Sequence, residues 1–216
     1  MNNRFLIILG VLILGFVGFL VFQNQTNNSG ENGDSSAQAS NHTQGEGNKN
    51  VTLIEYADFQ CPSCAAYYPI LDDVKEKYGD DITVQFRHFP LTQIHPNAMA
   101  AHRAAEAAAK QNKFWEMHDV LFGRQNLWAQ SENAAQVMED YATELGLNVE
   151  QFKTDYASSE VNGTINADIA SGNELEVSGT PTYILNGEKI ENPGPSVEAF
   201  SELIDQAIED SKETTE

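Results

Sequence analysis

The tetrapeptide Cys61-Pro62-Ser63-Cys64 constrains the fold of this 216-residue chain more than any other stretch, because it holds both of the chain's cysteines. Proline favours the first position of an α-helix, where its missing N–H would make no helical hydrogen bond anyway. A helix beginning at Pro62 would place the two Cα atoms about 5.5 Å apart, a separation that a disulfide spans without strain. The spacing therefore predicts a redox-active pair, with Pro62 and Ser63 tuning the first sulfur.

The position of each sulfur predicts its role. The free N–H groups and partial positive charge at a helix start stabilise a thiolate, which lowers the pKa of a cysteine placed there. We therefore expect Cys61 to be the exposed nucleophile and Cys64 to point into the fold. Glu55 lies six residues before Cys61, in an apolar segment over 51–57 that has the pattern of a buried strand. A carboxyl buried there would have a raised pKa and could exchange a proton with Cys64.

Two motifs resemble a known family. An apolar strand with an acid, followed by Phe-x-Cys-Pro-x-Cys over residues 59–64, resembles the DsbA-like thiol–disulfide oxidoreductases of the thioredoxin superfamily. The downstream motif Val-Ser-Gly-Thr-Pro-Thr-Tyr over residues 177–183 resembles that family's loop, in which a cis proline faces the cysteine pair. The resemblance implies a cis Thr180–Pro181 bond and a substrate-binding role for Thr180 and Pro181. The aromatic side chain of Phe59 is a further candidate for a peptide-binding groove, with core packing as the alternative.

The same resemblance assigns the remaining chemistry. Glu55 matches the family's buried acid, so the expected catalytic residues are Cys61, Cys64 and Glu55. No cofactor is expected beyond the redox-active Cys61–Cys64 disulfide. Many members of the family carry histidine where this chain has Ser63. Serine cannot supply a positive charge, so we expect a less extreme thiolate than in those members.

The hydrophobic pattern predicts a thioredoxin-like α/β fold (βαβ … ββα) with a large helical insertion. Strands over 51–57 and 82–88 flank a helix over 62–78, and helical patterns continue from about residue 94 to 175. Asn186-Gly187 predicts a hairpin turn. A last helix from Ser196 has Val197, Phe200, Leu203, Ile204 and Ile208 on its expected inner face. We place this domain at residues 51–210, followed by an acidic tail over 211–216.

The N-terminal part predicts attachment to a membrane. Residues 5–22 are all apolar or glycine, long enough to cross a bilayer, and Arg4 precedes them. The positive-inside rule then places the N-terminus in the cytoplasm and the rest of the chain outside, as a single-pass cell-membrane protein. A cleaved signal peptide is the alternative. Residues 23–50 are rich in Asn, Gln, Ser and Gly and predict a disordered linker.

Composition limits the partners. The chain has 32 acidic residues against 12 Lys and Arg, a formal net charge of −20, which argues against nucleic acid as a partner. No second cysteine pair exists, and His88, His95, His102 and His118 lack the close spacing of a ligand pair, so no metal site is expected. We interpret these histidines as surface or packing residues, and the chain as a monomer.

These observations predict an extracytoplasmic thiol–disulfide oxidoreductase that exchanges its Cys61–Cys64 disulfide with the cysteines of exported client proteins, as a dithiol oxidase. A membrane or small-molecule thiol redox partner would recycle the pair. A disulfide reductase or isomerase is the alternative within the same class, because the direction of exchange depends on that partner. A tethered peptide-binding or copper-binding module is the alternative outside the enzyme class.

Overall fold

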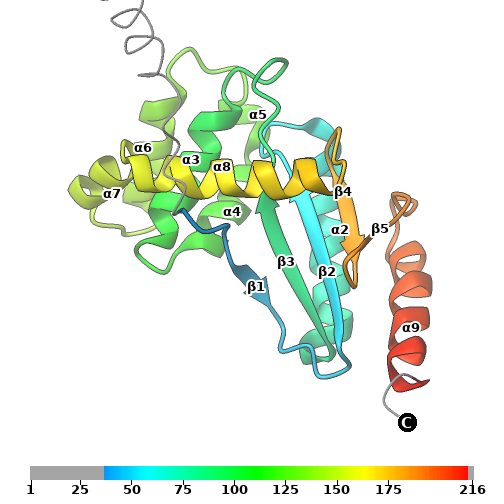
Figure 1. Cartoon of the computed structure of the whole chain (residues 1–216). Helices are drawn as coiled ribbons and strands as arrows, with labels where there is room; N and C mark the ends of the chain where they lie inside the picture. The colour runs from blue at the N-terminus through cyan, green and yellow to red at the C-terminus, as the bar shows by residue number, and fades with distance from the viewer. Residues whose placement is uncertain (1–36, 214–216) are drawn as a thin grey trace, which may run out of the picture. The chain divides into compact units, whose positions relative to one another are not determined.

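A computed structural model of the chain describes residues 37–213, which contain a five-stranded mixed sheet with strand order β1-β3-β2-β4-β5 (Figure 1). The strands are β1 (His42–Gln44), β2 (Val51–Ala57), β3 (Ile82–His88), β4 (Thr182–Leu185) and β5 (Glu188–Lys189). The helices are α2 (Pro62–Tyr78), α3 (Ala98–Ala109), α4 (Phe114–Gly123), α5 (Gln125–Trp128), α6 (Ala134–Glu144), α7 (Val149–Tyr156), α8 (Ser159–Glu174) and α9 (Val197–Glu213), with a 3₁₀ turn, η1, at Gly79–Asp81. The predicted α/β fold with its helical insertion is confirmed.

The βαβ unit that carries the cysteine pair forms over the predicted residues. β2 and β3 pair in parallel, with Val51 opposite Ile82 and Ala57 opposite His88, and α2 connects them. One face of the sheet packs against α2 and α9 through a buried cluster that includes Leu53, Val74 and Phe200. Burial of this apolar surface fixes the start of α2 at the carboxyl end of β2.

The helical insertion covers the other part of the sheet. Helices α3 to α8 occupy residues 98–174, close to the expected limits. In Figure 1, α8 runs across the sheet in front of β2 and β3, on the side away from α2. A second, larger buried cluster joins the insertion to the βαβ unit and contains Phe59, Cys64 and Phe86. The cysteine pair therefore lies at the junction between the sheet and the insertion.

The C-terminal ββα part is confirmed, with two corrections. Asn186 and Gly187 have φ values of 50° and 86°, the left-handed conformation that a type I′ hairpin requires. Phe200 and Ile204 of α9 are buried as expected, but Leu203 is 36% exposed and does not face the core. It lies beside the buried stripe of α9 rather than on it. The helix also continues through residue 213, so the domain does not end at residue 210.

The prediction of a disordered linker over 23–50 is wrong for its last part. Residues 42–44 form β1, which pairs antiparallel with β3. Ser40 is buried, and its N–H and hydroxyl both donate to the carboxylate of Asp168 in α8. At Gly45, φ is +79° and a Cβ atom would lie 2.1 Å from the carbonyl oxygen of Ile82, so only glycine fits this close turn. Contacts with distant residues, rather than local hydrophobicity, order this segment.

The predicted membrane anchor, over residues 5–22, lies outside the described residues. Within residues 37–213, no helix is both long and apolar enough to cross a bilayer. The N-terminal part of the predicted linker, residues 23–36, also lies outside the described part of the chain.

Candidate functional site

The cysteine pair lies at the start of α2, as the tetrapeptide predicts. Cys61 is the N-cap residue with extended backbone angles, Pro62 follows in the first turn, and Cys64 lies one turn along. Both cysteines are free thiols. Cys64 is fully buried, as expected. The expectation of an exposed Cys61 is wrong in degree, because only 7% of this residue is accessible. The loop before β4 lies against the sulfur of Cys61 and covers most of it. Cys61 is still more accessible than Cys64.

The helix start and the second thiol activate Cys61. A hydrogen bond from the Cys64 thiol outweighs burial and lowers the pKa of Cys61 to about 5. The N–H groups of Ser63 and Cys64 and the side chain of Thr180 act in the same direction. Burial raises the pKa of Cys64 well above its usual value, and the nearby Glu55 carboxyl adds to this effect. At neutral pH, the reduced site therefore holds a thiolate at Cys61 and a thiol at Cys64.

The loop before β4 faces Cys61 as the second motif predicts. The Thr180–Pro181 peptide bond is cis. In its protonated form, the Cys61 thiol donates to the carbonyl oxygen of Thr180, with 3.4 Å between sulfur and oxygen. Asn192 donates to the carbonyl oxygen of Pro181 at 2.7 Å and holds the loop in place. The Thr180 hydroxyl is buried without a hydrogen-bond partner. It is therefore free to donate to a thiolate at Cys61.

Glu55 is buried in the centre of β2, as the sequence predicts. It is 5% exposed, and burial raises its pKa to about 8, against the opposing effect of Lys75. The Tyr183 hydroxyl donates to its carboxyl oxygen at 3.4 Å. Glu55 and Lys75 also line a small cavity of about 10 Å³, the space of a single water molecule. A carboxyl with this pKa can exchange protons near neutral pH.

Phe59 does not lie where a substrate could reach it, so its predicted substrate-binding role is wrong. The side chain is fully buried, and its ring stacks on Phe86 with 4.9 Å between the ring centroids. Rings from the insertion, including those of His102 and Phe122, enclose it. Phe59 therefore supports the cysteine loop from the protein core and does not contact a client.

Sequence reasoning missed the polar residues that hold the cysteine loop. Asp58 is fully buried, and its carboxylate accepts the N–H groups of Gln60 and Leu91 and the ring N–H of His95 at 2.7–2.8 Å. The Gln125 amide donates to the carbonyl oxygens of Phe59 and Cys61. An aspartate directly after a buried strand is the one signal that could have indicated this role.

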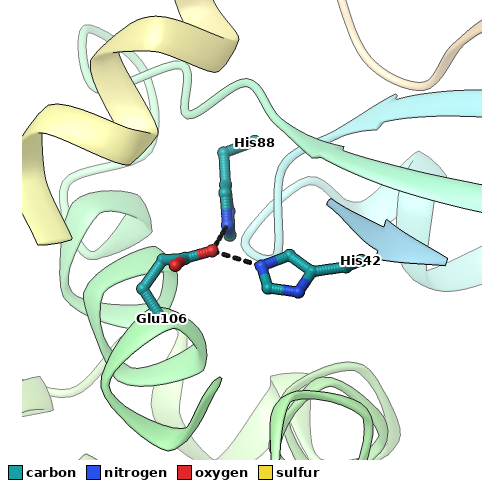
Figure 2. Close-up of side chains that lie close together, drawn as sticks. All are labelled: His42, His88 and Glu106. Atoms are coloured by element: carbon teal, nitrogen blue, oxygen red, sulfur yellow. Dashed lines mark hydrogen bonds and ion pairs between the residues drawn. The ribbon is translucent and has the colours of Figure 1, made fainter. Parts of the chain in front are cut away.

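Sequence reasoning also missed a cluster of histidines. Figure 2 shows His42 of β1 and His88 of β3 pointing at one carboxylate oxygen of Glu106 of α3. The ligand atoms of these three residues lie within 4.8 Å of one another, close enough to hold a metal ion. His42 was assigned to the linker, and the three residues are far apart in the sequence. Spacing along the chain therefore gave no signal.

A family model and several solved structures match this chain. The family model described as Thioredoxin matches residues 37–206. The structure of BdbD from Bacillus subtilis is 22% identical and has a TM-score of 0.68, over 81% of this chain and 97% of that chain. The structure of alpha-DsbA1 from Wolbachia pipientis is 20% identical with a TM-score of 0.70, over 82% and 95%. A thioredoxin-like oxidoreductase from Silicibacter pomeroyi is 24% identical with a TM-score of 0.65, over 77% and 91%.

Curated relatives match at higher identity over a small part of their length. The Na(+)/H(+) antiporter NhaA 1 of Mycolicibacterium gilvum is 38% identical over 154 residues, which are 70% of this chain and 24% of that protein. The antiporter NhaA 3 of Salinispora tropica is 36% identical over 167 residues, 77% of this chain and again 24% of that protein. The chain thus spans about a quarter of the length of the curated relatives it matches.

Proposed function

The chain belongs to the thioredoxin family, and on that premise we propose that it is a thiol–disulfide oxidoreductase that introduces disulfides into exported proteins. The observation that carries the proposal is the environment of Cys61. Its sulfur lies at a helix start, within hydrogen-bond reach of Cys64 and of Thr180, and its pKa is lowered to about 5. The matched solved structures share the fold, and two of them are named as BdbD and DsbA proteins.

The proposed reaction begins with the Cys61–Cys64 disulfide. A client thiolate attacks the sulfur of Cys61, forms a mixed disulfide and displaces the Cys64 sulfur, which takes up a proton. A second client thiolate then attacks the client sulfur of the mixed disulfide and releases Cys61 as a thiolate. Two client thiols are oxidised to a disulfide, and the enzyme disulfide is reduced to a dithiol.

The residues around the pair serve the individual steps. A low pKa makes Cys61 a good leaving group in the second step. Glu55 has a pKa of about 8, so it is largely protonated at neutral pH, and it lies near enough to Cys64 to affect the pKa of that thiol. It can therefore supply the proton that the departing Cys64 sulfur takes up. The backbone of Thr180 and Pro181 lies beside Cys61, where an extended client segment would pair with it.

The low pKa of Cys61 favours the direction of an oxidase. A stabilised thiolate stabilises the reduced enzyme, so the disulfide form gives up its oxidising equivalents more readily. We also propose that residues 5–22 anchor the chain in the cell membrane and hold the domain on the outer side, where exported proteins fold. A membrane or small-molecule thiol partner would reoxidise the pair there.

Oxidative refolding of a reduced client protein tests this function. The oxidised parent chain is expected to restore the client's disulfides, and Cys61→Ser to abolish the reaction. Cys64→Ser should also lose the reaction, because without its second cysteine the enzyme has no disulfide to pass to the client. Refolding by Cys61→Ser at the parent rate would overturn catalysis by this pair. Copper held in a one-to-one complex by both thiols, without refolding activity, would support a carrier instead.

A further inference from the structure

We propose that His42, His88 and Glu106 form a binding site for one divalent transition-metal ion of the zinc type, which ties the N-terminal strand to the core. The site lies on three separate elements: β1 gives His42, β3 gives His88 and α3 gives Glu106 (Figure 2). It is built from residues that the disulfide chemistry does not use, so it stands or falls independently of the proposed function.

The ligand set matches the chemistry of zinc. Two imidazole nitrogens and one carboxylate oxygen make a three-ligand protein site, with water in the fourth position of a tetrahedron. His88 and Glu106 are buried, and their contact is 2.6 Å from Nε2 to Oε1. His42 forms an ion pair and hydrogen bond with the same oxygen. Imidazole and carboxylate together disfavour Ca²⁺ and Mg²⁺, which prefer oxygen ligands alone.

The geometry requires only a small opening of the triad. Bonds of about 2.0–2.1 Å to a tetrahedral zinc ion place neighbouring ligand atoms about 3.3 Å apart. The three ligand atoms already lie within 4.8 Å of one another, and each imidazole faces the carboxylate oxygen at hydrogen-bond range. A metal ion would replace the two imidazole protons that now point at Glu106. The His88–Glu106 contact would lengthen from 2.6 Å to about 3.3 Å, a change of about 0.7 Å.

Both imidazoles are held in orientation by a second set of residues. The ring of His42 stacks on Phe114 with 3.4 Å between centroids and 7° between planes. The Nδ1 atom of His88 lies 2.6 Å from Nδ1 of His102, which is fully buried. Histidines that bind metals commonly use the second ring nitrogen in this way, which fixes the tautomer and the ring orientation.

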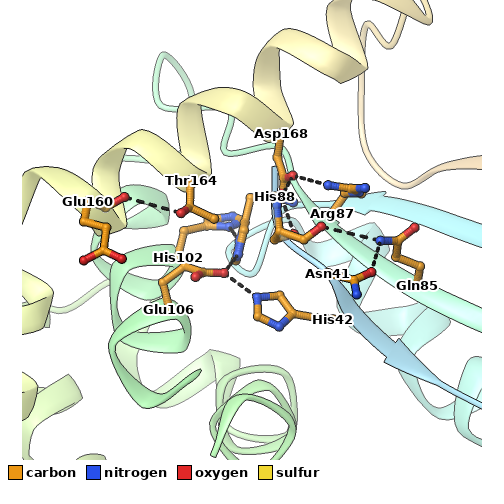
Figure 3. A network of polar contacts seen from close by, with 11 residues as sticks. Asn41, His42, Gln85, Arg87, His88, His102, Glu106, Glu160, Thr164 and Asp168 are labelled. Carbon is orange, nitrogen blue, oxygen red and sulfur yellow. Dashed lines mark hydrogen bonds and ion pairs between the residues drawn. The ribbon is translucent and has the colours of Figure 1, made fainter. Parts of the chain in front are cut away.

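His102, which lies next to His88 in Figure 3, can accept the proton that His88 must carry on Nδ1 when its Nε2 binds a metal. With Nε2 of His88 on the metal, its proton lies on Nδ1 and is donated to Nδ1 of His102. Nε2 of His102 accepts the backbone N–H of Phe59 at 3.4 Å and lies 3.6 Å from the Asp58 carboxylate. Asp58 is fully buried and accepts three other N–H groups, so it is built to remain charged.

The site also has an entrance and a structural consequence. The side chain of His42 is 14% exposed on the edge strand β1, so an ion can reach the ligands from solvent. A bound ion would join β1 and β3 to α3 and thereby stabilise the folded domain.

Zinc titration of the full-length chain in detergent tests the proposal. The chain should carry Cys61→Ala and Cys64→Ala, so that no thiol can bind the metal, and should first be stripped with a chelator. Calorimetry is expected to show one Zn²⁺ per chain. His42→Gln and Glu106→Gln should lose this binding, and His102→Phe should weaken it by about 10–100-fold through loss of the supporting hydrogen bond. Glu160→Gln, a change matched to Glu106→Gln but at an exposed carboxylate outside the triad, should bind as the parent does.

Two further readouts make the result decisive. Zinc should raise the thermal unfolding midpoint of the parent and leave that of His42→Gln unchanged, and circular dichroism should show that this edge-strand variant is folded without metal. Co²⁺ in the same site should give the strong visible absorption of a four-coordinate ion with nitrogen and oxygen ligands. Absence of zinc binding to the stripped parent, or equal binding by His42→Gln and Glu106→Gln, would show that the triad is a hydrogen-bonded group only and would overturn the proposal.

Discussion

The sulfur of Cys61 lies 3.4 Å from the carbonyl oxygen of Thr180, a residue 119 positions further along the chain. This contact joins the start of α2 to the loop before β4 and brings the two sequence motifs into one site. Its consequence is that Cys61 is shielded, with 7% of its surface accessible, while hydrogen bonds still favour its thiolate. A client must therefore approach along the Thr180–Pro181 loop to reach the sulfur.

The first prediction concerns the source of the low pKa of Cys61. The hydrogen bond from Cys64 is the largest cause of this shift, so Cys64→Ala should move the pKa from about 5 toward the ordinary value of 9.0. Alkylation rates of reduced protein, measured against pH, report this pKa directly. An unchanged midpoint in Cys64→Ala would show that the helix start alone stabilises the thiolate.

The second prediction concerns the Thr180 hydroxyl, which is buried without a hydrogen-bond partner and favours the Cys61 thiolate. Thr180→Val keeps the shape of the side chain and removes this donor. We expect the pKa of Cys61 to rise, and the oxidised protein, which holds no thiolate, to lose little or no stability, because no existing hydrogen bond is broken. The alkylation profile and urea unfolding check the two parts. A pKa equal to that of the parent would contradict the role of the hydroxyl.

The third prediction concerns Glu55 and pH. Burial raises its pKa in the folded chain to about 8, from the ordinary 4.5. Between these two values the folded chain binds more protons than the unfolded chain, so the parent loses stability as pH rises through that window. Glu55→Gln carries no such charge and should become more stable than the parent by a few kcal/mol, on the order of 1.4 kcal/mol per pH unit.

Urea unfolding measures this difference at about pH 5, 7 and 9, which cover the window and the pH just above it. The oxidised proteins are used because they have no thiols that titrate. The gap should be small at the lowest pH and widest at the highest. A gap that does not depend on pH would mean that Glu55 ionises normally. The same variant should slow disulfide exchange, because the Cys64 sulfur loses its proton donor.

The fourth prediction concerns the segment that composition assigned to a linker. A chain beginning at residue 51 lacks β1 and loses the two hydrogen bonds from Ser40 to Asp168. Each net hydrogen bond contributes roughly 0.5–1.5 kcal/mol, so we expect a loss of several kcal/mol relative to a chain beginning at residue 37. Urea unfolding in the presence of a chelator measures it without any effect of metal. Equal stability would restore the linker assignment.

Local patterns predicted the elements that carry the chemistry. The strand over 51–57, the helix from Pro62 and the turn at Asn186-Gly187 formed where expected, because alternation, proline position and turn residues act over a few neighbouring positions. The burial of Glu55 followed from the strand pattern and the cis Thr180–Pro181 bond from the family resemblance, and both are observed. These features depend on short sequence signals.

The remaining features depend on contacts between distant residues. The segment that contains Ser40 has no large apolar residue, yet Ser40 forms hydrogen bonds with Asp168, 128 positions away. Phe59 has a side chain suited to a peptide groove, but rings from the insertion bury it. The His42, His88 and Glu106 cluster forms only when β1, β3 and α3 pack together. No spacing in the sequence encodes such long-range contacts.

The redox equilibrium of the Cys61–Cys64 pair against glutathione tests the central claim most directly. A thiolate stabilised at Cys61 should make the pair more oxidising than thioredoxin, with a standard potential well above about −270 mV and toward the value of about −120 mV that characterises DsbA. A potential at or below about −270 mV would contradict the account, because the pair would then act as a reductant in disulfide exchange.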